Sequence, residues 1–259
     1  MTNELPMTGP ISAEVFATAA LSALRDVAQD NAAKIVTAAG LIRATIVSGG
    51  LLHAFGTGHS QAGALEVAGR AGGLIPTNRV ALSDLVVYGG ADPGVLDDPL
   101  LERDPKIGRR LFDLADIRRG DAVIVISNSG VNGAIVEFAA SAMGVGAPLM
   151  AIVSTAHSAA VRPAHPSGSR LSDLAAVTFD NGGPVGDALL PTAGGSRACG
   201  FSSLSTALIV QMLVAEVVRL MEQDGEEPPI YVSANLPGGH ERNVRIEASY
   251  QGRLRRRAS

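Results

Sequence analysis

Residues 120–133 read GDAVIVISNSGVNG. A turn signal, Gly120-Asp121, leads into five consecutive apolar residues, Ala122–Ile126, and these lead into the polar segment Ser127–Gly130. A continuous β-branched run of this length is typical of a strand buried on both faces, as in a parallel sheet. Apolar residues then recur at helical spacing, at Val131, Ile135, Phe138 and Met143. The stretch therefore predicts a strand, a polar loop and a helix in succession, the repeating unit of an α/β fold.

The same order of signals occurs earlier in the chain. Leu51–Phe55 predicts a strand, Gly56–Ser60 forms a glycine-rich loop after it, and helical spacing resumes from Ala62. We expect further strands at 80–87, 149–153 and 175–179, one helix or two over 11–48, a late helix from about Gly200, and an extended piece at 230–234. Strands that alternate with helices predict a doubly wound parallel sheet with right-handed crossovers.

Composition limits the classes of function. The chain has 259 residues, of which 46% are apolar and 3% aromatic, and its net charge is −4. This charge argues against a bulk electrostatic grip on nucleic acid or on an anionic membrane, so we expect neither as a partner. The basic run Arg253–Arg257 is expected to be a solvated tail.

Three features predict a cytoplasmic location. Cys199 is the only cysteine, which excludes an intrachain disulfide and a clustered-thiolate zinc site and fits a reducing compartment. Met1–Pro10 lacks the basic residues of a secretory signal. The apolar segment Leu204–Met221 contains Glu216 and Arg219, so we interpret it as a packing helix and not as a membrane span.

The two polar loops predict an anion site. Ligands of an open parallel sheet bind beyond the carboxyl ends of strands, where helix N-termini present unpaired backbone N–H groups. Gly56 and Gly58 let the backbone approach a ligand closely. Hydroxyl donors stand at four positions, Thr57, Ser60, Ser127 and Ser129. This arrangement suits a phosphate held without Lys or Arg; the alternative is that Ser, Thr and Asn only cap the helices.

Other interpretations of the first loop compete. A dinucleotide fingerprint requires glycine where Gln61 stands, and the Gly-Lys-Ser/Thr motif of a mononucleotide P-loop does not occur. A nucleophile elbow fits better, because Gly58–Ala62 lacks only the final glycine of G-x-S-x-G. The candidate triad follows in the order Ser60, Asp180 or Asp187, and His240. That order is found in α/β-hydrolases, so a serine esterase is an alternative.

Together, the two loops resemble the phosphate-binding loops of the sugar isomerase (SIS) domain, and the S-x-S-G loop is the more specific match. The resemblance runs through Gly56–Ser60, Glu66, Arg70–Leu74, Val125–Gly130, His165–Gly168 and Ser233–Asn235. It extends to a little-characterised subgroup of SIS proteins named as phosphosugar or phosphoheptose isomerases. It implies a three-layer α/β/α sandwich with a five-stranded parallel sheet, one domain over 1–259, and a homodimer or homotetramer. The helical segment 11–48 and the segment 230–259 would pack on this domain or on a partner subunit.

The resemblance implies a phosphorylated sugar as ligand and matches residues to it. The matching residues are Thr57, His59 and Ser60, with Gly56 and Gly58 around them, in the first loop, and Ser127, Asn128, Ser129 and Asn132, with Gly130 between them, in the second. Relatives commonly carry Thr where Asn132 stands, and Asn132 can still donate a hydrogen bond to phosphate. Asp187 follows the last expected strand and is a candidate contact to sugar hydroxyls. Ser202–Thr206 either cap the late helix or border the ligand.

Isomerisation between an aldose and a ketose needs groups that move protons. Glu66 is the first candidate, because it lies six residues beyond Ser60, about 9 Å along a helix. The alternative for Glu66 is a salt bridge to Arg70. His240 is the second candidate, since imidazole titrates near neutrality. The subgroup tends to carry an acidic residue at that place, so Glu241 is the substitute.

No spacing of histidines suggests a metal site, and no cofactor is expected. We therefore predict a phosphosugar-binding protein that acts as an aldose–ketose isomerase of a sugar phosphate. Two alternatives share the same loops. One is a phosphosugar sensor that catalyses nothing, and the other is an etherase or deaminase-type lyase acting on an amino-sugar phosphate. The serine esterase is the most distant alternative.

Overall fold

The computed structural model describes residues 11–255. Its first element, α1, spans Ala13–Val47 as one helix of 35 residues, which is one of the two arrangements that the apolar spacing allowed. The Ser12 side chain caps the helix by accepting a hydrogen bond from Val15 N. The expectations for Met1–Pro10 and for Arg256 and Arg257 concern residues outside the described range.

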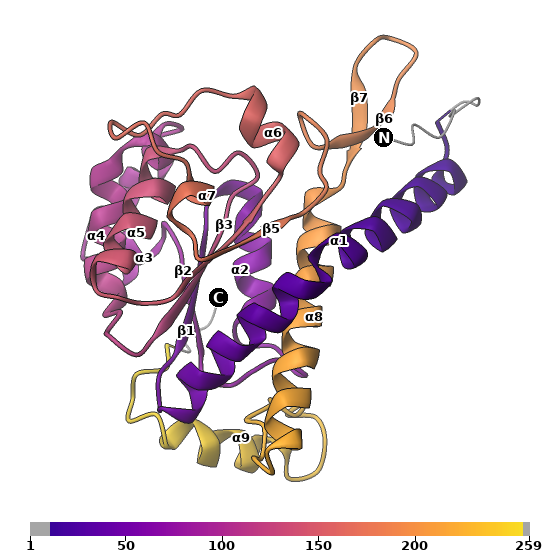
Figure 1. Cartoon of the computed structure of the whole chain (residues 1–259). Helices are drawn as coiled ribbons and strands as arrows, with labels where there is room; N and C mark the ends of the chain where they lie inside the picture. The colour runs from indigo at the N-terminus through magenta and orange to yellow at the C-terminus, as the bar shows by residue number, and fades with distance from the viewer. Residues whose placement is uncertain (1–10, 256–259) are drawn as a thin grey trace.

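Five parallel strands form the central sheet. They are β1 (Leu52–Gly56), β2 (Thr77–Val80), β3 (Ala122–Ile126), β4 (Leu149–Val153) and β5 (Val177–Asp180). Their order in space is β2-β1-β3-β4-β5, which confirms the predicted doubly wound sheet (Figure 1). The chain leaves β1 toward one edge and returns to β3 on its other side. Ligands of such sheets bind outside the carboxyl ends of the strands at this switch in strand order.

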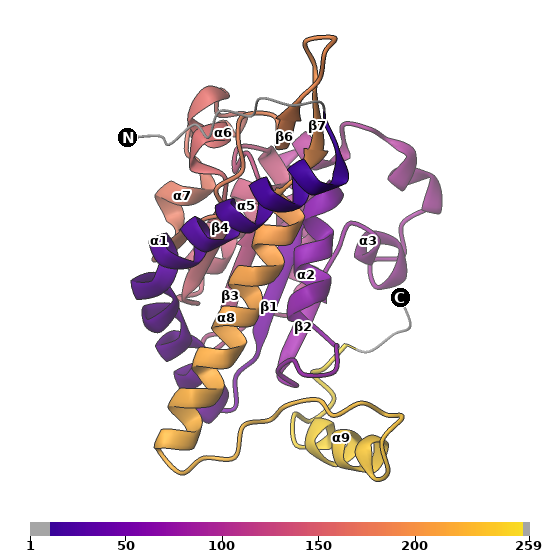
Figure 2. The same ribbon diagram turned by 90° about the vertical axis from the view of Figure 1, so that its right-hand side faces the viewer.

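Helices cover both faces of the sheet and complete the predicted three-layer sandwich (Figures 1 and 2). One face carries α1, α2 (Gln61–Val67) and α8 (Ser202–Gln223); the other carries α3 (Asp84–Val87), α4 (Pro105–Ala115), α5 (Gly133–Gly144) and α7 (Leu171–Leu174). Short turns are η1 (Gly58–Ser60), η2 (Pro93–Asp97) and η3 (Leu101–Arg103). At the carboxyl edge lie α6 (Thr155–Ala160) and a hairpin of β6 (Ala188–Pro191) and β7 (Arg197–Gly200), whereas α9 (Gly239–Ala248) lies at the amino edge.

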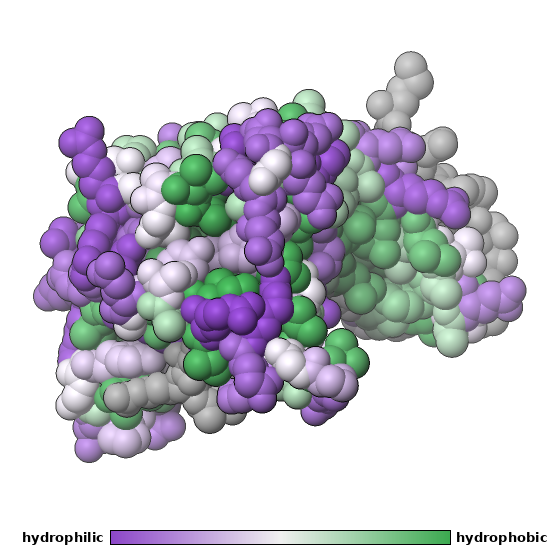
Figure 3. Space-filling view, turned by 90° about the horizontal axis from the view of Figure 1, so that it is seen from below, coloured by the Kyte–Doolittle hydropathy of each residue, from purple (hydrophilic) through white to green (hydrophobic). Residues whose placement is uncertain are grey.

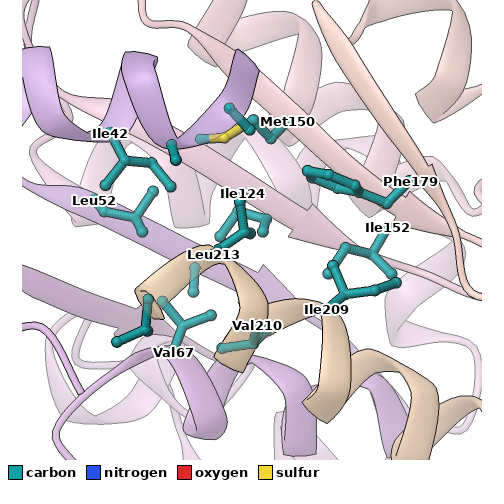
Figure 4. Close-up of a cluster of buried hydrophobic side chains, with 14 of the residues drawn as sticks. Ile42, Leu52, Val67, Ile124, Met150, Ile152, Phe179, Ile209, Val210 and Leu213 are labelled. Carbon is teal, nitrogen blue, oxygen red and sulfur yellow. The ribbon is translucent and has the colours of Figure 1, made fainter. Parts of the chain in front are cut away.

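Strand β3 shows how the sequence produces two cores. Ile124 belongs to the cluster that includes Ile209 of α8 (Figure 4), whereas Val123 and Val125 belong to the cluster on the opposite face, with Phe138 of α5. These five side chains, three from β3 and one each from α5 and α8, are fully buried. Burial of a side chain such as Ile or Phe contributes about 1.5–3 kcal/mol. A continuous apolar run is therefore what a strand between two helical layers requires.

The prediction of a strand at 80–87 is wrong. β2 ends at Val80, and the apolar residues that follow form the short helix α3. Asp84 Oδ2 accepts a hydrogen bond from Ala81 N at 3.2 Å, which turns the chain at the end of the strand. A short apolar run fits a buried strand and a buried helical turn equally well, so its pattern did not separate them.

The β6–β7 hairpin and α9 were not predicted. Only Leu190 of the hairpin strands is buried, and the apolar part of β6 is only Ala188–Leu190, which is too short to identify a strand. The extended piece expected at 230–234 pairs only briefly: Ile230 forms an isolated antiparallel bridge with Leu74, and Tyr231 N donates to Gly73 O at 2.9 Å. These contacts attach the C-terminal segment just before β2.

Among the described helices, only α8 has the length and hydropathy of a membrane span. Ile209, Leu213 and Val217 of this helix are at most 4% exposed and belong to the cluster between the sheet and α1. Packing in the core therefore accounts for the apolar composition of α8.

The expectation of a solvated tail is wrong for Arg253 and Arg255. Arg253 Nη2 lies 2.6 Å from Asp121 Oδ2, at the start of β3. Arg255 N donates to Asn78 Oδ1 at 2.9 Å, and its guanidinium lies 4.5 Å from the ring centroid of Tyr88. Residues 253–255 lie on the amino edge of the sheet, where Arg253 supplies a cation to the buried Asp121 carboxylate.

Candidate functional site

The two predicted loops lie side by side at the carboxyl edge of the sheet. Gly56–Ser60 ends β1 and Ser127–Gly130 follows β3, and Gly56 is paired with Ile126 in the sheet register. A Cβ atom on Gly56 would lie 2.6 Å from Ser60 O, so only glycine permits this tight turn. The switch in strand order between β1 and β3 therefore brings both loops to the place where such sheets bind ligands.

Hydroxyl groups in these loops are not used as helix caps. Ser60 stands at the N-cap of α2 and Asn132 at the N-cap of α5, and neither side chain makes a capping hydrogen bond. Within residues 11–255, the Ser60 and Ser129 hydroxyls have no hydrogen-bond partner, whereas buried Ser127 accepts one from Gly130 N at 3.1 Å. The capping alternative is therefore not realised at either loop, and the Ser60 and Ser129 hydroxyls are left for a ligand.

The other loop residues shape the backbone. Thr57 is 7% exposed, and its carbonyl oxygen accepts a hydrogen bond from Ser60 N at 3.1 Å. Gly58 and Gly130 have φ values of +54° and +63°, which glycine adopts without strain. His59 is exposed at the rim of the first loop.

A small pocket opens between the loops and the start of α8. Its lining residues are His59, Ser60, Gly63, Ile126, Asn128, Asn181, Ser202, Ser203 and Thr206. Asn181 is 1% exposed and donates from Nδ2 to Asn128 Oδ1 at 3.0 Å, which holds the second loop in place. The lining is rich in hydroxyl and amide groups and includes no carboxylate and no Lys or Arg. It can therefore donate hydrogen bonds to an anion without a fixed counter-charge.

Asp187 caps α8. Its Oδ1 accepts a hydrogen bond from Ser202 N at 2.7 Å, and its Oδ2 accepts one from the Ser202 hydroxyl at 2.8 Å. Asp187 thus has a structural role beside the pocket, and its contact to sugar hydroxyls stays a prediction. The sequence left two roles open for Ser202–Thr206, capping α8 or bordering a ligand. Ser203 and Thr206 line the pocket from α8, so their positions fit the second role.

Glu66 is engaged by its neighbours. Gln211 Nε2 donates to Glu66 Oε1 at 2.5 Å, and Arg70 forms an ion pair with the same oxygen. Glu66 does not line the pocket. The salt bridge that the i,i+4 spacing offered as an alternative is therefore present.

His240 and Glu241 lie at the opposite edge of the sheet. Both are exposed residues of α9, which lies beyond the amino ends of the strands (Figure 1). Asn243 holds the helix there, since its side chain bonds Val232 N at 3.0 Å and Val232 O at 2.7 Å. Within one chain, the structure does not bring His240 and Glu241 to the phosphate loops, where the prediction placed them. The same separation removes the Ser60–His240 contact that an esterase triad requires.

In the part of the chain from 11 to 255, no three His, Cys, Asp or Glu side chains are grouped so that they could hold a metal ion. The groups at and near the pocket are hydroxyls, amides, backbone N–H groups and carboxylates. Such groups bind oxyanions and transfer protons.

Comparison with known proteins places the chain in a family. Residues 15–154 match the SIS domain. A UPF0309 protein of Caldanaerobacter subterraneus subsp. tengcongensis is 38% identical over 226 residues, which cover 86% of this chain and 90% of the relative. A UPF0309 protein of Streptomyces avermitilis is 35% identical over 246 residues, which cover 93% of this chain and 96% of the relative.

Solved structures agree on the architecture. A phosphoheptose isomerase from Francisella tularensis superimposes with a TM-score of 0.53 over 80% of this chain and 96% of its own, at 16% identity. The phosphoheptose isomerase GmhA from Neisseria gonorrhoeae superimposes with a TM-score of 0.52 over 80% of this chain and 96% of its own, at 18% identity. At these identities the likeness shows the fold alone. By the match to the domain and the identity to its relatives, this chain belongs to the SIS domain family.

Proposed function

We propose that this protein binds a phosphorylated sugar between its two carboxyl-edge loops and interconverts the aldose and ketose forms of that sugar. The observation that carries the proposal is the convergence of hydroxyl and amide groups from both loops and α8 on one pocket, where the Ser60 hydroxyl has no hydrogen-bond partner within the described residues. The named activity of the two phosphoheptose isomerases with the same fold is consistent with it.

The N-terminus of α5 supports the phosphate part of the proposal. α5 begins at Gly133 after the second loop, and its first backbone N–H groups and partial positive charge favour an anion. At α8, in contrast, the Asp187 carboxylate already accepts from Ser202 N. Ser60 and Ser129 add hydroxyl donors that have no other partner in the described part of the chain.

A phosphosugar sensor without catalysis is the second candidate. It is favoured by one observation: of the carboxylates and imidazoles predicted to move protons, Glu66 is ion-paired and His240 and Glu241 lie at the other edge. Measured turnover of a bound sugar phosphate separates the two candidates.

The binding step is tested by thermal unfolding with pentose, hexose, heptose and amino-sugar phosphates, each beside its unphosphorylated sugar. A ligand present at 100 times its Kd stabilises the folded state by about 2.7 kcal/mol. We expect stabilisation that depends on the phosphate group and is lost in Ser60→Ala/Ser129→Ala. Ser22→Ala, a change on α1 away from the pocket, is the control and should respond like the wild type. Stabilisation by none of these sugar phosphates would contradict the proposal.

We further propose a cytoplasmic homo-oligomer. Large apolar side chains on α1 are exposed, including Leu21 at 58% and Val36 at 52%. Seen from below, hydrophobic residues gather toward the side on which α1 begins (Figure 3). An exposed apolar face of this kind is typical of subunit contacts. Light scattering of the purified chain tests this part, and a monomer at micromolar concentration would contradict it.

A further inference from the structure

Glu102 lies between the two loops, although no motif in the sequence singles it out. It belongs to η3, and its Oε1 accepts a hydrogen bond from Asn132 Nδ2 at 2.8 Å. Its Oε2 lies 4.0 Å from the position that a Cβ atom would take on Gly58. One carboxylate thus contacts the second loop and faces the backbone of the first.

The backbone fixes this position tightly. A Cβ atom on Gly133 would lie 2.1 Å from Arg103 O, so the absence of a side chain there lets η3 pack directly on the start of α5. Leu101 anchors η3 in the apolar cluster on that face. Asp104 ends the turn by capping α4, since its Oδ1 accepts a hydrogen bond from Lys106 N at 2.9 Å. Glu102 is therefore held from both sides.

The charge of Glu102 is not neutralised by a neighbour. Among residues 11–255, no Lys, Arg or His lies within ion-pair distance of its half-buried carboxylate. Glu66, in contrast, is paired with Arg70, and Asp187 is committed to the start of α8. Of these three carboxylates at the carboxyl edge, Glu102 alone combines the lack of a cationic partner with an oxygen, Oε2, that accepts no hydrogen bond within the described residues.

We propose that Glu102 is the carboxylate that moves a proton between C1 and C2 of the bound sugar, an inference that rests on the proposed function. Repulsion between a carboxylate and a phosphate places the phosphate toward Ser60 and Asn128 and the carbonyl end toward Glu102. The remaining N–H of Asn132 Nδ2 can then donate to the sugar's carbonyl oxygen.

The proton balance of the step is complete. Glu102 Oε2 takes the proton from C2 of the aldose while a solvent water molecule gives a proton to the oxygen on C1, which gives the enediol and a hydroxide ion. Oε2 then returns its proton to C1, and the hydroxide ion takes the proton of the C2 hydroxyl group, which gives the ketose and restores the water molecule. Protons gained equal protons lost, and no oxidant or reductant is consumed.

The test compares wild type with Glu102→Gln, Asn132→Ala and Asp97→Asn in D2O, with arabinose 5-phosphate, glucose 6-phosphate and mannose 6-phosphate as probes. Proton NMR measures deuterium incorporation at C2, and thermal shift measures affinity. Glutamine keeps an oxygen that accepts from Asn132 but cannot take a proton. Because proton transfer by one positioned group contributes about 10²–10⁴-fold, Glu102→Gln should slow exchange by about 100-fold or more, with affinity within about threefold.

The controls separate this role from a structural one. Asn132→Ala should slow exchange less than Glu102→Gln, and Asp97→Asn, an exposed carboxylate of η2, should exchange like the wild type. Equal exchange in wild type and Glu102→Gln would overturn the inference, as would equal losses in Glu102→Gln and Asn132→Ala. A wild type that is stabilised by a probe but exchanges no C2 proton would overturn it and leave binding intact. A wild type that no sugar phosphate stabilises would overturn the proposed function too.

Discussion

The two edges of the sheet use polar residues in opposite ways. At the amino edge, Asp121 is 1% exposed and accepts hydrogen bonds from Leu51 N and Arg118 N, both at 2.9 Å, and from Arg253 Nη2 at 2.6 Å. Asn78 bonds two backbone groups of the C-terminal segment. At the carboxyl edge, the Ser60 and Ser129 hydroxyls make no hydrogen bond within the described residues. Polar groups that satisfy one another hold the fold together, whereas polar groups left open are available to a ligand.

Asp121→Ala gives the largest expected loss of stability. It removes a buried carboxylate, leaves Arg253 and two backbone N–H groups without their acceptor, and should lower the free energy of unfolding by about 3–5 kcal/mol. Urea denaturation at pH 7 measures this. Asp113→Asn, which breaks an exposed ion pair with Arg109, is the control and should change stability little. Similar losses of unfolding free energy in both variants would show that Asp121 contributes no more to stability than an exposed carboxylate.

Acid should weaken the amino edge first. Burial raises the pKa of Asp121, but the neighbouring His53 imidazole and the hydrogen bonds from Arg253 and two backbone N–H groups outweigh it and hold that pKa well below its usual value. The group therefore stabilises the fold above about pH 4, its usual pKa in the unfolded chain, and this stabilisation is lost as the pH falls below that value. Unfolding of the wild type between pH 5 and 2 should show the decline, and Asp121→Asn should show a flatter one. Parallel curves would contradict this.

Serines of the carboxyl edge should divide into two groups. Ser154 is fully buried, donates to Gly183 O at 2.6 Å and accepts from His157 N at 3.0 Å, so Ser154→Ala should lower stability by about 1–3 kcal/mol. Ser60→Ala and Ser129→Ala remove hydroxyls with no partner and should change the stability of the free protein by less than about 0.5 kcal/mol. Thermal unfolding without ligand measures all three. A large loss in Ser60→Ala would show that this serine is structural.

Much of the fold could be predicted because its signals are local. The run Ala122–Ile126 predicts a strand buried on both faces. Similar apolar runs predicted the positions of β4 and β5 to within two residues. The region after Val80 failed because a short apolar run does not distinguish a strand from a helical turn. The hairpin was missed because its strands are short and only Leu190 in them is buried.

The candidate site was predictable only in part. Both loops were found because glycine and serine after a strand have a direct physical meaning. His240 was misplaced because its position after two glycines does not say at which edge of the sheet the segment lies. Glu102 was missed because its place beside Asn132 depends on the close approach of η3 to Gly133, two segments about 30 residues apart in the chain.

The sequence by itself determined the α/β architecture, the two polar loops and the family to which the chain belongs, because periodicity and short motifs act over a few neighbouring residues. Only the tertiary structure decided which carboxylates are free and which are engaged. It paired Glu66 with Arg70 and Gln211, assigned Asp187 to α8, and left one oxygen of Glu102 open between the loops. The reason is physical: the partners of a charged group are set by which distant segments pack together, and sequence spacing does not record that.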